Sequence, residues 1–153
     1  MKQRFIQISL FLLLLTSWSC KKEDMFLDRL EGTWNIDRLE RYEIHPDGSA
    51  ITLTDEKNVG TLSMKVATID GLTLDNLKDF EFNYTENGNA VNQIGVLKVD
   101  EQAKRVIILG GDCIQCDIAY TVEINKKNEQ VWSTFSYDQQ SNLSYKLTYT
   151  LRR

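Results

Sequence analysis

Few side chains in this sequence have a type and spacing that indicate a reactive or metal-binding site. The clearest group is the run Cys113-Ile-Gln-Cys116. Two thiols at this spacing could exchange electrons, bind zinc or form a structural disulfide. Redox exchange is helped by a helix that begins at the motif, but the residues from Asp117 onward alternate as a strand does. Structural zinc needs about four ligands, and the chain adds only one histidine, His45. We therefore favour a Cys113–Cys116 disulfide, with zinc, redox exchange and free thiols as alternatives.

No other group of residues predicts catalysis. His45 precedes Pro46 in a predicted turn and has no serine, cysteine or second histidine at a telling spacing, so we interpret it as a surface residue. No carboxylate pair stands where a general acid and base would be expected, and no glycine-rich phosphate loop opens a helix. We expect no enzymatic activity, no cofactor and no metal site.

The charge distribution argues against nucleic acid as a partner. The formal net charge is −4, and the lysines and arginines are scattered along the chain. A protein that binds nucleic acid usually gathers its basic residues into a patch that neutralises phosphates. We expect no nucleic-acid partner.

The third cysteine, Cys20, follows a segment typical of export signals. Lys2 and Arg4 give a positive start, and an apolar stretch runs from Phe5 to Leu15. That stretch is shorter than the roughly 20 apolar residues of a membrane-spanning helix. We therefore expect residues 1–19 to be a cleaved signal peptide and interpret a permanent transmembrane anchor as the weaker alternative.

The run Thr16-Ser-Trp-Ser-Cys20 resembles the lipobox of bacterial lipoproteins. In that family a diacylglyceryl group is attached to the cysteine sulfur before cleavage, and the new amino terminus is then acylated, for example with palmitate. Trp18 departs from the small or aliphatic residue usual at its position, whereas Ser19 fits the pattern. The resemblance implies that Cys20 carries the lipid and that the membrane is a partner. Two or three acyl chains hold a protein durably, because each buried methylene contributes about 0.8 kcal/mol.

The residues after Cys20 bear on location. Lys21-Lys-Glu-Asp24 resembles the surface-export signal of some outer-membrane lipoproteins, and no aspartate follows the cysteine directly, as it would in an inner-membrane retention signal. We expect a lipid-anchored protein of the cell outer membrane, on either the periplasmic face or the cell surface. A solvated spacer is the simpler interpretation of these charges.

From Gly32 onward, polar and apolar residues alternate with a period of two, which is typical of half-buried strands. In Leu143–Leu151 every odd position is apolar or aromatic and every even one is polar. Turn residues divide the chain into about nine strands. These lie near 33–45, 49–55, 61–69, 78–85, 90–99, 105–110, 117–125, 130–137 and 143–152. The turn at Asn58-Val-Gly60 separates the second from the third.

The connections are short, which favours an antiparallel meander, because a parallel crossover needs about a dozen residues. Such a sheet hides its apolar face by closing into a barrel or by folding into a sandwich. We predict an all-β barrel of about eight or nine strands over residues 32–153, with a β-sandwich as the alternative. The tether, 20–31, ends in a short helix from Asp24 to Leu30. Residues 72–77 are predicted to form a turn of helix or an irregular loop.

The run Leu30-Glu-Gly-Thr-Trp34 at the start of the first strand resembles the G-x-W motif of lipocalins and of lipocalin-like domains in bacterial lipoproteins. In that calycin-type family the tryptophan closes one end of the barrel and packs on an arginine near the chain end. Arg152 and Arg153 are the candidates, and we assign the role to Arg152. The resemblance implies that Gly32, Trp34 and Arg152 close the barrel. The family's second motif, a threonine-aspartate pair, is missing, and no ligand is implied.

Aromatic residues are the remaining binding candidates. Trp132 alternates with Phe135 and Tyr137, so one ring is expected in the core and another exposed. Tyr145 and Tyr149 share the apolar face of the last strand, where they line a cavity or fill it. We therefore carry two hypotheses: a barrel that binds a small hydrophobic ligand, and a filled barrel that interacts with envelope proteins. A cavity of about 300 Å³ or more with a few polar groups would favour the first.

Overall fold

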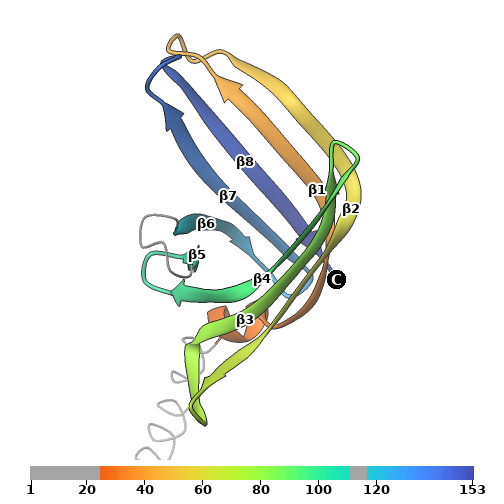
Figure 1. Ribbon diagram of the computed structural model, residues 1–153, viewed down its shortest axis with the longest axis vertical. Coiled ribbons are helices and arrows are strands. Elements are labelled where there is room, and N and C mark those ends of the chain that lie inside the picture. Colours follow the sequence, from red (N-terminus) through yellow and green to blue (C-terminus); the bar gives the residue numbers. More distant parts are fainter. Residues whose placement is uncertain (1–24, 111–116) are drawn as a thin grey trace, which may run out of the picture.

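The computed structural model describes residues 25–110 and 117–153, which form one short helix and eight antiparallel strands (Figure 1). The elements are α2 (Met25–Leu30), β1 (Gly32–Ile44), β2 (Ala50–Ile69), β3 (Leu72–Glu86), β4 (Asn89–Asp100), β5 (Arg105–Ile108), β6 (Ile118–Asn125), β7 (Glu129–Asp138) and β8 (Leu143–Arg152). Each strand pairs with its neighbours in chain order, and β8 pairs with β1, which closes the barrel. The predicted all-β meander and barrel are confirmed. In the part of the chain that is described, no helix has the length and apolar character to cross a membrane.

β2 is a single strand of 20 residues where the sequence predicted two. The expected turn at residues 58–60 is a bulge, in which Asn58 has a φ of 53° and the pairing with β1 shifts register. Gly60 permits the close approach of β3, because a Cβ there would lie 2.0 Å from the carbonyl oxygen of Asn83. Bulges and turns use the same residue types, since both need unusual backbone angles or a missing side chain. The barrel therefore has eight strands, not nine.

The prediction of a helical turn or loop at residues 72–77 was wrong, because these residues begin β3. Asp70 and Gly71 both have positive φ, 51° and 78°, as a two-residue hairpin turn requires. Ala67 pairs with Leu74 and Val66 pairs with Lys78, so residues 75–77 have no partner on β2. This irregularity interrupts the alternation of polar and apolar residues, so the start of β3 could not be recognised as a strand from the sequence.

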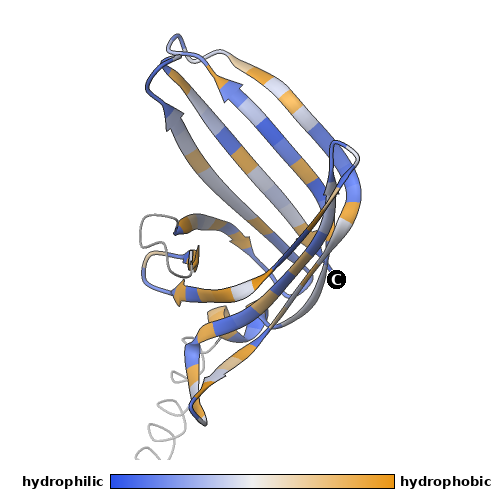
Figure 2. Cartoon of the chain, in the orientation of Figure 1, coloured by the Kyte–Doolittle hydropathy of each residue, from blue (hydrophilic) through white to orange (hydrophobic). Residues whose placement is uncertain are grey.

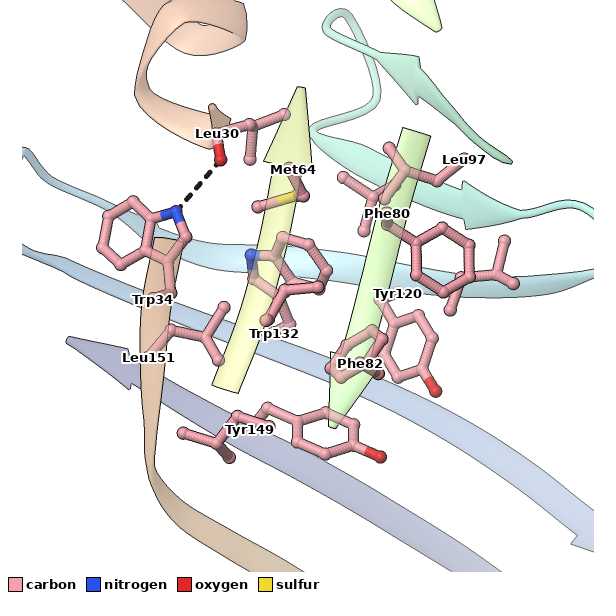
Figure 3. Packing of buried hydrophobic residues seen from close by; sticks show 14 of the residues in the cluster. Leu30, Trp34, Met64, Phe80, Phe82, Leu97, Tyr120, Trp132, Tyr149 and Leu151 are labelled. Carbon is pink, nitrogen blue, oxygen red and sulfur yellow. Dashed lines mark hydrogen bonds between the residues drawn. The ribbon is translucent and has the colours of Figure 1, made fainter. Parts of the chain in front are cut away.

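Side chains fill the half of the barrel next to α2, which we call the closed half (Figure 3). Its buried residues include Leu30, Trp34, Ile36, Leu62, Met64, Phe80, Leu97, Val106, Val122, Trp132 and Leu151. They come from every strand, since alternate residues of each strand point inward. Figure 2 shows the corresponding alternation of hydrophobic and hydrophilic positions along the strands.

Hydrogen bonds hold the expected helix, α2, to the closed half. The indole Nε1 of Trp34 donates to the carbonyl oxygen of Leu30 at 3.0 Å. Trp132 Nε1 donates to Gln130 Oε1 at 2.9 Å, and Gln130 Nε2 donates to the carbonyl oxygen of Arg29 at 2.7 Å. The last carbonyls of the helix, which have no partner inside it, are thereby bonded from the barrel.

The arginine that packs on Trp34 is Arg153, so the assignment of Arg152 was wrong. The guanidinium carbon of Arg153 lies 4.0 Å from the centroid of the Trp34 ring. Arg152 instead pairs with Asp37 at 3.2 Å and Glu129 at 3.6 Å. The reason is alternation, because Leu151 points inward and the next residue of the strand must point outward. Arg153 lies beyond the strand and can bend over the barrel end.

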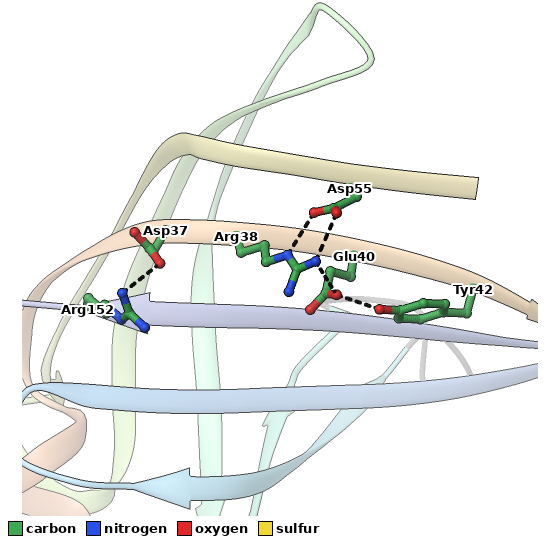
Figure 4. Close-up of polar contacts among 6 residues, drawn as sticks. All are labelled: Asp37, Arg38, Glu40, Tyr42, Asp55 and Arg152. Atoms are coloured by element: carbon green, nitrogen blue, oxygen red, sulfur yellow. Dashed lines mark hydrogen bonds and ion pairs between the residues drawn. The ribbon is translucent and has the colours of Figure 1, made fainter. Parts of the chain in front are cut away.

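The outer face of β1 carries a polar network, which Figure 4 shows with the Arg152–Asp37 pair. Arg38 donates two hydrogen bonds to Asp55, at 2.7 and 2.9 Å, and lies 3.1 Å from Glu40. The hydroxyl of Tyr42 donates to Glu40 at 2.5 Å. The hydrogen bond from Arg38 lowers the pKa of Asp55 below its usual value. Because these residues point outward, the residues between them, Leu39 and Arg41, point inward.

Candidate ligand-binding cavity

The half of the barrel far from α2 contains an open cavity of about 740 Å³. We call this the open half. Its lining residues are Arg41, Leu53, Asp117, Ile118, Ala119, Tyr120, Thr134, Phe135, Ser136, Tyr145, Lys146 and Leu147. The cavity exceeds the roughly 300 Å³ at which ligand-binding pockets begin.

The cavity opens through the side of the barrel because β5 and β6 are short. β6 pairs with β7 only from Thr121↔Ser133 to Asn125↔Gln130. β5 pairs with β4 over four residues, 105–108. Within the described residues, β5 and β6 therefore bridge β4 and β7 over only a few residues. The lining residues 118–120 of β6 and 134–136 of β7 stand on opposite sides of the opening.

Aromatic rings separate the cavity from the closed half. The ring of Tyr149 lies 5.5 Å from Phe82, 6.0 Å from Tyr84 and 5.9 Å from Tyr120, measured between centroids. We call Tyr84, Tyr120 and Tyr149 the tyrosine floor. Tyr149 donates a hydrogen bond from its hydroxyl to that of Tyr84 at 3.3 Å. Figure 3 shows the hydroxyls of Tyr120 and Tyr149 pointing away from Trp34.

Two residues of the tyrosine floor, Tyr120 and Tyr149, stay uncharged at neutral pH. Tyr120 is 5% exposed and Tyr149 is 4% exposed. Burial, which penalises the charged phenolate, raises the pKa of Tyr120 to about 12 and also raises the pKa of Tyr149. The hydroxyls can therefore donate or accept hydrogen bonds without carrying charge.

An ion pair joins β1 and β3 in the open half. Nη2 of Arg41, on β1, lies 2.7 Å from Oε1 of Glu86, on β3. Glu86 Oε1 is buried, and this contact lacks the alignment of a hydrogen bond. The pair thus places a partly satisfied carboxylate oxygen beside Arg41, which lines the cavity. Arg41 and Tyr120, which belong to the lining, give a mainly apolar cavity polar groups at this end.

The aromatic candidates divide as the sequence predicted. Trp132 is fully buried, whereas Phe135 is 62% exposed and Tyr137 is 58% exposed. Tyr145 lines the cavity, and Tyr149 is buried against the lining residue Tyr120, with 5.9 Å between the ring centroids. At the rim, Lys146 Nζ lies 5.5 Å from the centroid of the Phe135 ring.

Sequence reasoning missed Arg41, Glu86, Tyr84 and Tyr120 as members of one site. The inward direction of Arg41 could not be predicted from alternation, because a bulge between Ile36 and Arg38 changes which positions of β1 point inward. Trp34 and Ile36 are inward at even numbers, and Leu39 and Arg41 at odd numbers. The alternation of Phe80, Phe82 and Tyr84 did mark the inward face of β3, and continuing it by one step reaches Glu86.

The three cysteines, Cys20, Cys113 and Cys116, lie outside the described residues, so the lipid attachment and the disulfide stay predictions. His45 is described, and its Nε2 lies 3.2 Å from Oε1 of Glu43. Across residues 25–110 and 117–153, no three histidine, cysteine or acidic side chains come together as a metal site would require.

Comparison with known proteins assigns no family to this chain. No family model and no curated protein matches the sequence. Among solved structures, the chain is similar to a redesigned β-barrel, with 13% sequence identity and a TM-score of 0.43, over 84% of this chain and 95% of that one. The closed eight-stranded barrel is therefore established by the strand pairing itself.

Proposed function

We propose that this protein binds a small hydrophobic ligand in the open half of its barrel, as a lipocalin-like lipoprotein of the outer membrane. The cavity of about 740 Å³ carries the proposal. Ligand sites are typically concave and mostly apolar, with a few polar groups that fix the orientation of the ligand. The role proposed is binding, not catalysis.

The residues that line the cavity suggest how the ligand is oriented in it. Leu53, Tyr145 and Leu147 offer apolar surface, and Ile118 adds to it at the opening. Arg41 and the hydroxyl of Tyr120, both in the lining, offer hydrogen bonds at the inner end. We therefore expect a ligand with an apolar body and one hydrogen-bonding end. The body enters between β6 and β7.

The anchor is a separate part of the proposal and is supported by the lipobox resemblance around Cys20. α2 begins at Met25, so a lipid on Cys20 would tether the closed half of the barrel to the membrane. We propose the outer membrane as the location, with the opening of the cavity in the half that is farther from the tether.

Native mass spectrometry of the protein isolated from its host tests ligand binding. We expect a bound small molecule in the chain that begins at residue 21, and its loss in Thr134→Trp, which fills the cavity. Tyr137→Trp, on the exposed face of β7, should keep it. An apoprotein that shows no thermal shift with fatty acids or haem would contradict the proposal and favour the alternative, an interaction module for envelope proteins.

Partitioning between detergent and water tests the anchor. We expect the full chain made in a bacterial host to enter the detergent phase, and Cys20→Ser to stay in water. Cys113→Ser is the matched control, because it removes a thiol without removing the proposed lipid. Detergent partitioning by Cys20→Ser would show that Cys20 is not the attachment site.

A further inference from the structure

The hairpin of β2 and β3 carries an apolar face that nothing covers within the described residues. Ile69 is 46% exposed, Leu72 is 68% exposed and Leu74 is 38% exposed. Ile69 pairs with Leu72, and Ala67 with Leu74, so the three aliphatic side chains lie on one face of the hairpin. We call Ile69, Leu72 and Leu74 the hairpin face. Thr68 and Thr73 form the pair between them and point to the opposite side.

The hairpin projects past the end of the barrel that α2 covers (Figure 1). Lys78 Nζ lies 2.6 Å from Oε1 of Glu31, the residue that follows α2, so the pair Val66↔Lys78 is level with the helix end. The hairpin continues for three more pairs and a turn. At about 3.3 Å per residue it extends roughly 10 to 13 Å farther.

The proposed lipid would bring this hairpin to the membrane. Cys20 precedes Met25 by five residues, which span about 18 Å at most when fully extended. An acyl-anchored Cys20 therefore keeps α2 close to the bilayer. The hairpin extends past the helix end by a large part of the maximum distance between α2 and the bilayer, so its tip can reach the bilayer surface. The cavity lies in the other half of the barrel, so the hairpin face has no part in lining it.

We infer that the hairpin face is a second membrane contact, which enters the interfacial layer of the bilayer beside the lipidated Cys20. This inference rests on the lipid anchor of the proposed function. Amphipathic segments lie in the interface with their apolar face in the acyl boundary and their polar face toward water. Leu72 and its two aliphatic neighbours supply the first face, and the two threonines supply the second. The contact would orient the barrel with its cavity away from the bilayer.

A single new tryptophan tests the contact. The two tryptophans of the described barrel, Trp34 and Trp132, are both 0% exposed, so Leu72→Trp adds an indole in a new environment. The lipidated full chain is reconstituted in vesicles of phosphatidylethanolamine and phosphatidylglycerol with brominated acyl chains, which quench nearby indoles. We expect the added fluorescence of Leu72→Trp to fall about twofold or more relative to unbrominated vesicles, as insertion beside acyl chains requires.

Ile94→Trp is the matched control, because Ile94 is 71% exposed on β4 in the barrel wall. Its added fluorescence should be quenched far less. Equal quenching in the two variants, with the chain bound to vesicles, would overturn the inference and leave the anchor standing. A chain that fails to sediment with vesicles would overturn both the hairpin contact and the lipid anchor. Ile69→Trp repeats the test from the facing strand, and an indole already shielded without vesicles would indicate a protein contact and contradict the inference.

Discussion

The guanidinium of Arg153 covers the ring of Trp34, with 4.0 Å between the guanidinium carbon and the ring centroid. Trp34 is 0% exposed even though it lies at the barrel end. Gly32 leaves room for this arrangement, because a Cβ there would lie 3.0 Å from Nη2 of Arg153. The barrel end is thus closed by the last residue of the chain and the first strand together.

Replacing Arg153 by alanine should destabilise the barrel by about 1 kcal/mol, since the cation–π contact is lost and the Trp34 ring is uncovered. Urea unfolding followed by circular dichroism measures the change. Arg152→Ala is the control, because it removes exposed ion pairs that contribute about 0 to 1 kcal/mol. A larger loss in Arg152→Ala would restore the sequence-based assignment.

Gly60→Ala should destabilise the protein by about 3 kcal/mol or more, because the methyl group would collide with backbone and force the strands apart. The Cβ would lie 2.0 Å from the carbonyl oxygen of Asn83 and 2.5 Å from the Cα of Tyr84. Gly71→Ala, in the exposed turn with no atom within 4 Å, should cost only the strain of its positive φ, about 1 kcal/mol. Thermal unfolding of the two variants ranks them, and the opposite ranking would exclude close packing at the bulge.

Sequence pattern predicted the class of fold because period-two alternation is a property of each strand alone. β8 shows this, since its inward residues Leu147, Tyr149 and Leu151 recur at every second position. The pattern failed where strands are irregular. Gly60 and residues 75–77, which have no partner on β2, mark irregularities that only the neighbouring strand reveals. For this reason a continuous β2 was predicted as two strands and the start of β3 as a helical turn or loop.

The site was less predictable than the fold. Tyr145 and Tyr149 were recognised because they share one strand. Arg41 and Glu86 are 45 positions apart in the sequence, and they meet because β1 and β3 both pair with β2. The inward direction of Arg41 depends on a bulge. Such a pair has no local signal, because strand pairing and register decide which distant residues meet.

Arg41→Met should destabilise the folded protein by about 1 to 3 kcal/mol, because it leaves the buried Oε1 of Glu86 without its charge partner. Glu86→Gln should cost less, since the remaining Arg41 side chain is 39% exposed and water can solvate it. The double variant should lose less than the sum, because the two residues interact directly. Urea unfolding of all four proteins completes the cycle. Additive losses would show that the pair contributes no coupling energy.

The tyrosine floor predicts a loss of stability in alkali. The unfolded chain releases the Tyr120 proton near pH 10, whereas burial raises the pKa of Tyr120 to about 12 in the folded state. Above about pH 10 the unfolded state therefore binds fewer protons than the folded state, and the free energy of unfolding falls as the pH rises. Below that pH both states hold the proton and the residue has no effect. Tyr120 alone should remove about 2 kcal/mol by the time the pH reaches its folded pKa, and Tyr149 should add to the loss.

Urea unfolding from about pH 8 to about pH 11 measures this dependence, and phenolate absorbance reports ionisation in the folded state. The variant Tyr120→Phe/Tyr149→Phe should have a flatter profile, because phenylalanine keeps the rings and removes the titrating hydroxyls. Tyr137→Phe is the control, since Tyr137 is 58% exposed and its loss leaves the floor intact. Ligand binding should depend on the same hydroxyls, so the double variant should also bind the native ligand more weakly while its barrel remains folded. An unchanged pH profile in the double variant would show that the alkaline loss arises elsewhere in the barrel.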